Sequence, residues 1–321
     1  MDAPRPLTSV VIPCYNQGHF LDEAVTSATS VTHRVEVIVV DDGSTDDTPQ
    51  VVERHPAVRY VRQQNRGLAA ARNRGLAESS GDLVIFLDAD DRLLPDGIDA
   101  GVRALTSNPG CALAYGRCVM MGPEGTEWPT PQQRRVLSGH HAVLLRTNPI
   151  WTPAMAIFRR HALVEAGGFG EGFDGSADYD LYLRIAARYP VHDHGALVAA
   201  YRRHDASMSG SASRMLRDTL AVMSRHRPAD GEIAQLDAWR EGCDAWRDFY
   251  GTQLTEEIRG HVGERQVVPA VEKVWALARY APEILRREAG RKLRTLIARL
   301  PYAGRAIPAA EISAASRRAD V

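Results

Sequence analysis

Leu83-Val84-Ile85-Phe86-Leu87-Asp88-Ala89-Asp90-Asp91 joins an apolar, strand-like run to three carboxylates. In α/β proteins, ligands bind at the carboxyl ends of the strands. Clustered carboxylate oxygens there suit a hard divalent cation such as Mg²⁺ or Mn²⁺. The alternative is an ordinary solvated turn, because Asp favours turns and helix starts. Other parts of the sequence are needed to distinguish a cation site from a turn.

Short apolar runs alternate with helical patterns over the first hundred residues. We expect strands at 9–12, 35–40, 58–61 and 83–87, with Pro13 ending the first strand, and helices at about 20–28, 48–54 and 68–77. Strands that alternate with helices predict a mostly parallel sheet covered by helices on both faces. The ends of the strands then bring residues 14–16, 41–44 and 88–91 to one rim of the sheet.

Composition excludes several classes of protein. The chain has 321 residues, a formal net charge of -1, and 44% hydrophobic and 25% charged residues, which is ordinary for a globular protein and gives no sign of a nucleic-acid partner. Its four cysteines contain no CxxC pair and favour a reduced, cytoplasmic location over a disulfide framework or a zinc site. No apolar run of about twenty residues predicts a membrane span.

The turn after the first strand excludes two common nucleotide sites. Residues 13–18 read Pro-Cys-Tyr-Asn-Gln-Gly, which lacks the GxGxxG fingerprint, and the chain has no GxxxxGK[ST] loop. Without a glycine cradle, a bound diphosphate would have to be neutralised by a metal and by side chains. The carboxylates of Asp88, Asp90 and Asp91 offer such a metal site.

Taken together, a series of motifs resembles family-2 glycosyltransferases of the GT-A fold over about residues 7–210. The resemblance implies a Rossmann-like, mostly parallel sheet flanked by helices, in which residues 1–110 bind the donor and residues 111–210 the acceptor. An all-helical region, 211–321, would follow. The motifs are Ser9-Val10-Val11-Ile12-Pro13-Cys14-Tyr15-Asn16, Val39-Val40-Asp41-Asp42-Gly43-Ser44-Thr45-Asp46, Gly67-Leu68-Ala69-Ala70-Ala71-Arg72-Asn73-Arg74-Gly75, Phe86-Leu87-Asp88-Ala89-Asp90-Asp91, Gly167-Gly168-Phe169, Asp178-Tyr179-Asp180-Leu181 and Tyr201-Arg202-Arg203-His204.

The same resemblance implies the residues that bind a nucleoside-diphosphate sugar. The ring of Tyr15 would pack on the base, and Asp42 would accept the imide N–H of uracil or thymine, so a UDP- or dTDP-linked donor is expected. The alternative for residues 41–45 is an Asp-Gly turn followed by a helix cap, and for Arg66 a solvated helix start. The expected donor-binding residues are Pro13, Tyr15, Asn16, Asp41, Asp42, Arg66, Asp88 and Ala89.

The resemblance also implies a Mn²⁺ or Mg²⁺ ion. Asp90 would coordinate the ion directly, Asp88 would contact the ribose and the shell of the metal, and His204 would be a further ligand. The alternative for His204 is a surface or hydrogen-bonded histidine.

Four neighbours of this expected metal site have predicted supporting roles. Asp91 is expected to cap the helix whose start Pro95 marks. Asn73 is expected to bind backbone near the metal loop. Arg202 or Arg203 would pair with phosphate.

Asp178 is the expected catalytic base, in the first turn of a helix that Ser176 would cap. The alternative is that Asp178 only complements the helix dipole. Related sequences often have Glu-Asp here, whereas this chain has Ala177-Asp178. That departure leaves the acceptor contact open and keeps Asp174 or Asp180 as alternative bases.

The predicted function is metal-dependent, inverting transfer of a sugar to the hydroxyl of a glycan, a lipid-linked precursor or a small molecule, in polysaccharide, cell-envelope or glycoconjugate biosynthesis. A catalytically impaired nucleotide-sugar-binding protein is one alternative. A sugar nucleotidyltransferase is another, although it should carry a Gly-rich loop with Arg and Lys after the first strand. In the C-terminal region, residues 279–305 form a basic amphipathic stretch. This stretch either docks on its own protein or makes peripheral contact with the inner face of the plasma membrane.

Overall fold

A computed structural model describes residues 6–173, 175–204 and 207–298. It divides the chain into two compact units, Met1–Tyr250 and Gly251–Val321. The first unit runs past the boundary expected at residue 210, because helix α8 (Ala212–Arg225) packs on α7 (Ala177–Ala186) and the first part of α9 (Ile233–Gly263) belongs to the same unit. Trp239 ties α9 to α8 by donating its ring N–H to the carbonyl of Met223 at 2.6 Å.

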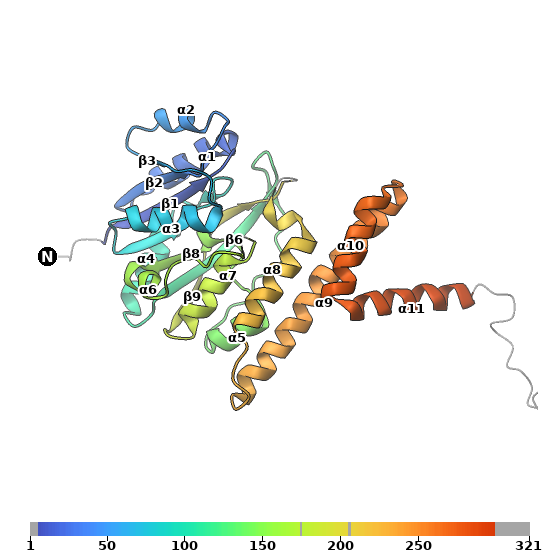
Figure 1. The fold of residues 1–321 in the computed structure, drawn as a ribbon. Helices are drawn as coiled ribbons and strands as arrows, with labels where there is room; N and C mark the ends of the chain where they lie inside the picture. The colour runs from blue at the N-terminus through green and yellow to red at the C-terminus, as the bar shows by residue number, and fades with distance from the viewer. Residues whose placement is uncertain (1–5, 174, 205–206, 299–321) are drawn as a thin grey trace, which may run out of the picture. The chain divides into compact units, whose positions relative to one another are not determined.

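The first half of the sheet is parallel, as predicted (Figure 1). β1 and β4 are buried on both faces because helices cover the sheet, so their sequences are almost continuously apolar. The strands run in the order β3-β2-β1-β4. Their bounds are β1 (Thr8–Cys14), β2 (Val35–Asp41), β3 (Arg59–Arg62) and β4 (Leu83–Phe86), connected through α1 (Gly18–Thr29), α2 (Thr48–Glu53) and α3 (Leu68–Glu78).

Strand β1 continues through Pro13, where we expected it to end. Pro13 lies in register with Val40 of β2. The carbonyl of Val11 accepts a hydrogen bond of 2.9 Å from Leu87 on the β4 side, and alternate residues of a strand bond to opposite neighbours. The nitrogen of Pro13 therefore points to the same side, beyond the end of β4, where its missing N–H costs no ladder bond.

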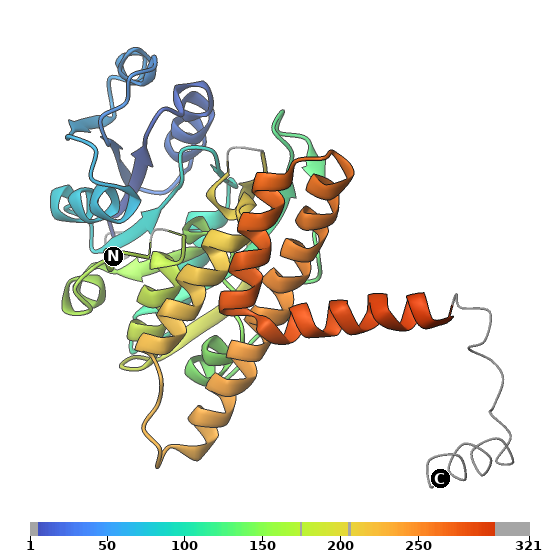
Figure 2. The same cartoon turned by 45° about the vertical axis from the view of Figure 1, so that its right-hand side comes forward.

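The second half of the sheet is mixed. β8 (Ala156–Arg159) is antiparallel to β4 and to β6 (Leu113–Met121), and β6 is parallel to β9 (Val191–Arg202). β5 (Arg92–Leu93) pairs antiparallel with the end of β9, which brings the residues after β9 next to the acidic loop 88–91. The remaining elements of this half are β7 (Glu127–Trp128), α4 (Gly97–Ser107), α5 (His140–Arg146), α6 (Arg160–Glu165) and the 3₁₀ turns Pro153–Met155 and Met208–Gly210. Figure 2 shows α7 and α8 side by side next to this sheet.

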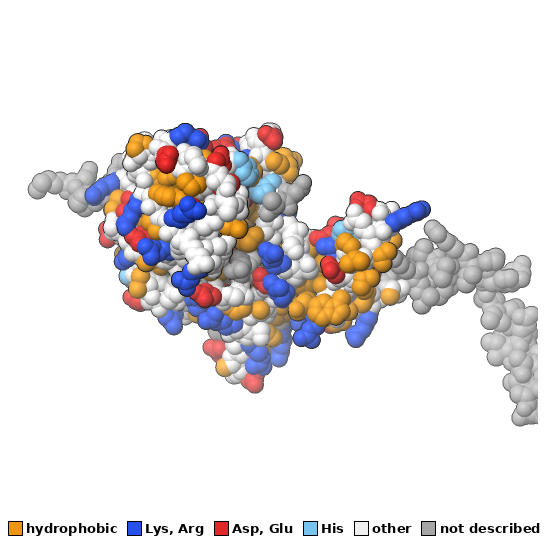
Figure 3. Space-filling model, turned by 45° about the horizontal axis from the view of Figure 1, so that its top comes forward, with side chains coloured by type: hydrophobic (Ala, Val, Ile, Leu, Met, Phe, Trp, Pro, Cys, Tyr) orange, Lys and Arg blue, Asp and Glu red, His pale blue; other side chains and the backbone are white. Residues whose placement is uncertain are grey.

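The described part of the second unit, 251–298, is helical, as the sequence predicted. The end of α9 is followed by α10 (Val267–Tyr280) and α11 (Pro282–Ala298). Arg259 of α9 pairs with Glu288 of α11 at 2.6 Å. Apolar side chains gather on the surface of these helices (Figure 3), where Val267, Val268, Val271 and Trp275 are each more than half exposed.

The amphipathic stretch 279–305 is described only in part. Ile284, on its apolar stripe, is buried, whereas residues 299–305 lie outside the described residues. Membrane contact through this stretch stays a prediction. Within the described ranges, no helix is long and apolar enough to cross a bilayer.

Candidate active site

The loops after β1 and β2 are joined into one structure. Asn16 has a left-handed backbone with φ of 53°, a conformation that Asn tolerates better than most residues. Its N–H donates to the Ser44 hydroxyl at 3.0 Å, and its side-chain oxygen accepts the Thr45 N–H at 2.8 Å. Gly43 has φ of 83°, and a Cβ there would lie 2.9 Å from the backbone nitrogen of Asn65. Two segments that were expected to contact the donor therefore meet, as predicted for one rim of the sheet.

Asp41 is buried and shapes its own turn. Its carboxylate accepts the Ser44 N–H at 2.7 Å and the Tyr60 hydroxyl at 2.5 Å. Arg62 lies 3.5 Å away on the same carboxylate. Hydrogen bonds from protein groups thus hold a side chain that we expected to bind the donor.

Asp42 holds the loop that leads into α3. Its carboxylate accepts hydrogen bonds from the Gln63 side chain at 2.7 Å and from the Arg66 and Gly67 N–H groups at 2.9 Å each. A carboxylate has about four lone-pair sites, and protein donors use three of those on Asp42, which is only 3% exposed.

Tyr15 and Arg66 present accessible groups at this rim. The Tyr15 side chain is 48% exposed, as a ring that stacks on a base has to be. Arg66 is also exposed, and its guanidinium has no ion-pair partner in the described part of the chain. Pro13, by contrast, is buried in β1. Tyr15 and Arg66 therefore remain the accessible candidates for contact with the donor.

The acidic segment forms a turn whose members have separate partners. The Asp91 N–H bonds to the Asp88 carbonyl at 3.0 Å, and Ala89 is fully buried. Asp90 and His204, 114 positions apart, meet with 2.9 Å between Oδ2 and Nε2. Burial raises the pKa of Asp90 and the neighbouring Asp88 raises it further, while His204 opposes the shift. The turn we considered as the alternative is real, and it also carries the carboxylate–imidazole pair expected of a cation site.

Our expectation that Asp91 caps a helix is wrong. α4 begins at Gly97, and its N-cap residue is Asp96. Asp91 is instead buried, where Thr152 Oγ1 donates to it at 2.6 Å and the Arg202 N–H at 2.9 Å. Burial raises its pKa well above the usual range, and the Asp90 and Asp88 charges add to the shift. The short strand β5 separates Asp91 from α4, which the sequence pattern did not reveal.

Arg202, one of the two arginines expected to pair with phosphate, is not free to do so. It is 2% exposed and forms an ion pair with Glu23. Its guanidinium also donates to the carbonyls of Asp90 at 2.7 Å and Pro123 at 2.6 Å. Arg203 is partly exposed and remains the candidate of the two.

Asp178 lies in the first turn of α7, as predicted. Its carboxylate accepts the Tyr179 N–H at 2.8 Å. Burial raises the pKa of Asp178 to about 6, although the charge of Arg72 works in the opposite direction. A carboxylate with such a pKa can change protonation state near neutral pH, as a general base has to.

Arg72 is the residue that sequence analysis missed. It is buried in α3, donates to Asp88 at 2.6 Å and lies 5.1 Å from the centroid of the Phe169 ring. The Coulomb interaction of its guanidinium with Asp88 and with Asp178 raises its own pKa, against the effect of burial. A signal was present, because Arg72 stands four residues before buried Leu76, on the apolar face of α3.

Asp180 is not available as an alternative base. It is fully buried, 2.8 Å from Arg184 and 2.9 Å from His226. Burial opposes its ionisation, but these two partners hold the pKa of Asp180 below its usual range. The other alternative, Asp174, lies outside the described residues.

Asn73 has a structural role and bonds to backbone, as we expected. It binds the backbone of Phe169, donating to the carbonyl at 2.9 Å and accepting from the N–H at 2.8 Å. It therefore fixes the turn Gly167–Phe169, whose Phe169 ring packs against Phe86 at the end of β4. Ser176 is the N-cap residue of α7, but its hydroxyl contacts Thr219 at 3.0 Å instead of capping the helix.

Asp90 and His204 fit a divalent cation that also binds substrate. In the ranges described, no three His, Cys, Asp or Glu side chains are grouped to hold a metal. Mg²⁺ that binds together with a substrate phosphate is usually held by one or two carboxylates, by the phosphate oxygens and by water. A carboxylate and an imidazole at this rim supply protein ligands of the right chemistry and leave the other positions to a diphosphate.

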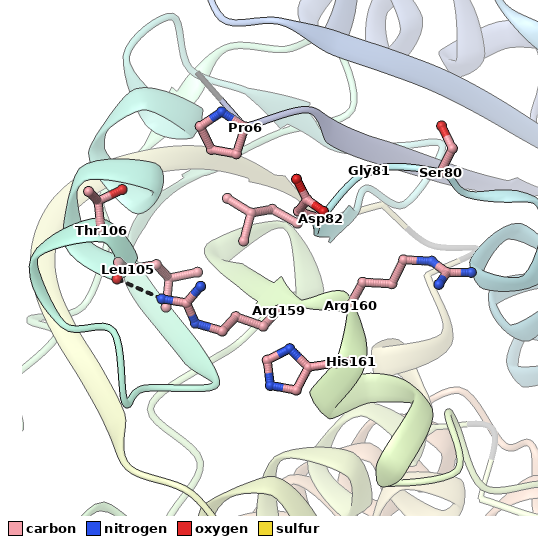
Figure 4. A pocket seen from close by; sticks show the side chains of 10 residues that line it. Pro6, Ser80, Gly81, Asp82, Leu105, Thr106, Arg159, Arg160 and His161 are labelled. Carbon is pink, nitrogen blue, oxygen red and sulfur yellow. Dashed lines mark hydrogen bonds between the residues drawn. The ribbon is translucent and has the colours of Figure 1, made fainter. Parts of the chain in front are cut away.

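A cavity of about 530 Å³ lies at the other end of β4, next to Asp82 and Arg160 (Figure 4). Arg159 in its wall is bonded to the carbonyls of Leu105 and Cys111, each at 2.8 Å. Arg160 donates to the Ser79 hydroxyl at 3.2 Å. The cavity is formed where β4 starts, so it is separate from the loops that carry the motifs.

Similarity to solved structures establishes the class of fold. The structure of S. aureus TarS 1–349 in complex with UDP-GlcNAc matches with a TM-score of 0.59 at 20% identity, over 74% of this chain and 71% of that one. The mannosyltransferase PcManGT from Pyrobaculum calidifontis, in complex with GDP-Man and Mn²⁺, matches with a TM-score of 0.57 at 19% identity, over 85% and 86%. The chain has the α/β fold of GT-A glycosyltransferases.

Sequence similarity establishes the family. Residues 9–167 match the family described as Glycosyl transferase family 2, and the chain belongs to this family. It is 29% identical to chondroitin synthase of Escherichia coli over 195 residues, 56% of this chain and 26% of that protein. It is 28% identical to the O-antigen biosynthesis protein RfbC of Myxococcus xanthus over 255 residues, 72% of this chain and 19% of that protein. The chain thus spans about a fifth to a quarter of the length of these relatives.

Proposed function

We propose that this protein transfers a sugar from a UDP- or dTDP-linked donor to an acceptor hydroxyl, with inversion at the anomeric carbon and with Mn²⁺ or Mg²⁺ as cofactor. The observation that carries the proposal is the pairing of Asp90 with His204 beside the rim formed by the loops after β1 and β2, with Arg72 bonded to Asp88 of the same acidic turn and its charge acting on Asp178. Two neighbours in fold, solved with UDP-GlcNAc and with GDP-Man and Mn²⁺, support a nucleotide-sugar donor and a metal.

The chain's own residues supply binding and proton transfer. Tyr15 stacks on the base, Asp42 accepts its N–H, and Asp90 and His204 hold the cation. When bound, the cation would stabilise the negative charge that builds on the leaving diphosphate. Asp178 takes the proton of the acceptor hydroxyl, whose oxygen attacks the anomeric carbon from the face opposite the diphosphate.

The acceptor is a glycan or a lipid-linked saccharide in this proposal. Relatives named for chondroitin synthesis and O-antigen biosynthesis support a role in polysaccharide or cell-envelope assembly. Ala177, which replaces the expected glutamate, is buried at the start of α7. A catalytically impaired nucleotide-sugar-binding protein would share the donor site but would not hydrolyse or transfer the sugar, so a donor-hydrolysis assay with Mn²⁺ separates the two.

UDP or dTDP with Mn²⁺ is expected to raise the melting temperature of the protein, because a ligand that binds only the folded state stabilises it by about 2.7 kcal/mol at a concentration 100 times its Kd. The same nucleotide without metal should give a much smaller shift. A thermal-shift screen of nucleoside diphosphates with and without Mn²⁺ measures both effects. A larger shift with GDP than with UDP would contradict the assigned base, and no shift with any nucleotide would contradict donor binding.

Transfer is expected to depend on pH with an apparent pKa near 6 on the acid side. Burial raises the pKa of Asp178 to about 6, and only the ionised carboxylate accepts a proton. The rate should therefore fall about tenfold per pH unit below 6 and level off above it. Initial rates between pH 4.5 and 8 at saturating donor measure the profile. A rate that is constant down to pH 4.5 would contradict the role of Asp178.

A further inference from the structure

Arg202 bonds to several segments around the acidic loop. From the end of β9, its Nε donates to the Asp90 carbonyl at 2.7 Å and its Nη1 to the Pro123 carbonyl at 2.6 Å. Its remaining Nη pairs with Glu23 of α1, and its guanidinium lies 4.7 Å from the centroid of the Phe20 ring. A buried guanidinium with these partners leaves the backbone of Asp90 little freedom to move.

The backbone of Arg202 holds Asp91, the residue that follows Asp90. The Arg202 N–H donates to Asp91 Oδ1 at 2.9 Å, and Thr152 fixes the other oxygen of that carboxylate at 2.6 Å. His204 follows two residues later, with its ring 4.9 Å from the Phe20 ring, between centroids. The segment 202–204 therefore contacts the acidic loop twice, through Arg202 and through the imidazole of His204.

We propose that Arg202 is a positioning residue for the cation site: it fixes the backbone of Asp90 and the end of β9 so that the Asp90 carboxylate and the His204 imidazole face one point. This inference rests on the proposed metal-dependent function. Groups that orient metal ligands without touching the metal commonly change metal affinity by about 10- to 100-fold when they are replaced. Hydrogen bonds from a charged donor, such as the one to the Asp90 carbonyl, are the stronger kind.

Arg92 provides a matched control. It pairs with the same Glu23 at 2.7 Å and donates to the carbonyl of Gly125, in the same β6–β7 loop as Pro123, at 3.2 Å. In the described structure it makes no hydrogen bond to Asp90 or Asp91. Replacement of Arg92 removes a similar ion pair and a similar hydrogen bond to a carbonyl. It leaves the hydrogen bond from Arg202 to the backbone of Asp90 in place.

The test compares Arg202→Lys with Arg92→Lys in the full chain. Mn²⁺ affinity in the presence of UDP is measured from the electron paramagnetic resonance signal of free Mn²⁺, and the melting temperature is measured in parallel. Lysine keeps the charge but cannot reproduce the guanidinium fork. We expect Arg202→Lys to weaken Mn²⁺ binding about 10- to 100-fold, and Arg92→Lys to leave it within about twofold.

Unchanged Mn²⁺ affinity in Arg202→Lys would overturn the inference, as would an equal loss in Arg92→Lys. If Arg202→Lys does not fold, Thr152→Val loosens Asp91 from the other side, and it should weaken Mn²⁺ binding in the same direction; no change in that variant would also overturn the inference. A wild-type protein that binds UDP equally well with and without Mn²⁺ would instead contradict the metal dependence of the proposed function, and the positioning role with it.

Discussion

Asp178→Asn is expected to lower the rate of sugar transfer by about 10²- to 10⁴-fold, the usual contribution of a general base, while nucleotide binding is unchanged. The amide has the shape of the carboxylate and can still accept the Tyr179 N–H, which now lies at 2.8 Å from the Asp178 carboxylate. The start of α7 is therefore preserved, but the side chain can no longer take a proton from the acceptor. Single-turnover transfer rates and the UDP-induced shift in melting temperature, measured on the same preparation, separate chemistry from binding.

Two carboxylates of the same region serve as controls. Asp180→Asn should reduce stability, because it breaks the ion pairs with Arg184 and His226, and should affect transfer only through that loss. Asp174→Asn tests the alternative base that remains. Transfer at the wild-type rate by Asp178→Asn, or loss of transfer in Asp174→Asn alone, would assign the base elsewhere.

The fold of the first half could be predicted because its signals are local. Alternation of apolar runs with helical patterns located β1, β2, β3 and β4 to within a few residues, and all four are parallel. The second half is mixed because β8 inserts antiparallel between β4 and β6, and strand direction depends on contacts between distant residues. The sequence shows that a strand exists near residue 156, but its hydrophobic pattern is the same in either direction.

Prediction of the site from the sequence is limited in the same way, because the roles of its side chains also depend on contacts between distant residues. The motifs placed Asp90 and His204 in one site, and the structure brings their side chains together. The individual roles within Asp88 to Asp91 depend on partners that are remote in sequence: Asp91 bonds to Thr152 and to the backbone of Arg202. A carboxylate buried by such partners looks identical in the sequence to one that caps a helix.

Buried arginines are the other class of residue that sequence analysis assigned incorrectly or passed over. An arginine in a motif next to an expected diphosphate site is easily assigned to phosphate, as we expected of either Arg202 or Arg203. Its burial among Glu23, Asp90 and Pro123 shows that its charge is already neutralised and its donors are used. Arg72 similarly meets carboxylates of its own protein. Buried charges need partners in the fold, and these partners decide which cations remain available to a ligand.

Asp90→Asn is expected to abolish the dependence of nucleotide binding on Mn²⁺. The carboxylate that meets His204 at 2.9 Å is the proposed direct ligand, so its loss should exceed the roughly 10- to 100-fold effect of outer contacts on metal affinity. Without metal, the variant should bind UDP at least as well as the wild type, because Asp90 and Asp88 no longer both face the diphosphate with negative charge.

The control is Asp82→Asn. Asp82 is an exposed carboxylate at the start of β4, so its replacement removes the same charge far from the site and should change neither measurement. Calorimetric titration of UDP into the wild type and each variant, with and without Mn²⁺, gives the six affinities. Tight Mn²⁺-dependent binding of UDP by Asp90→Asn would show that the cation is held elsewhere.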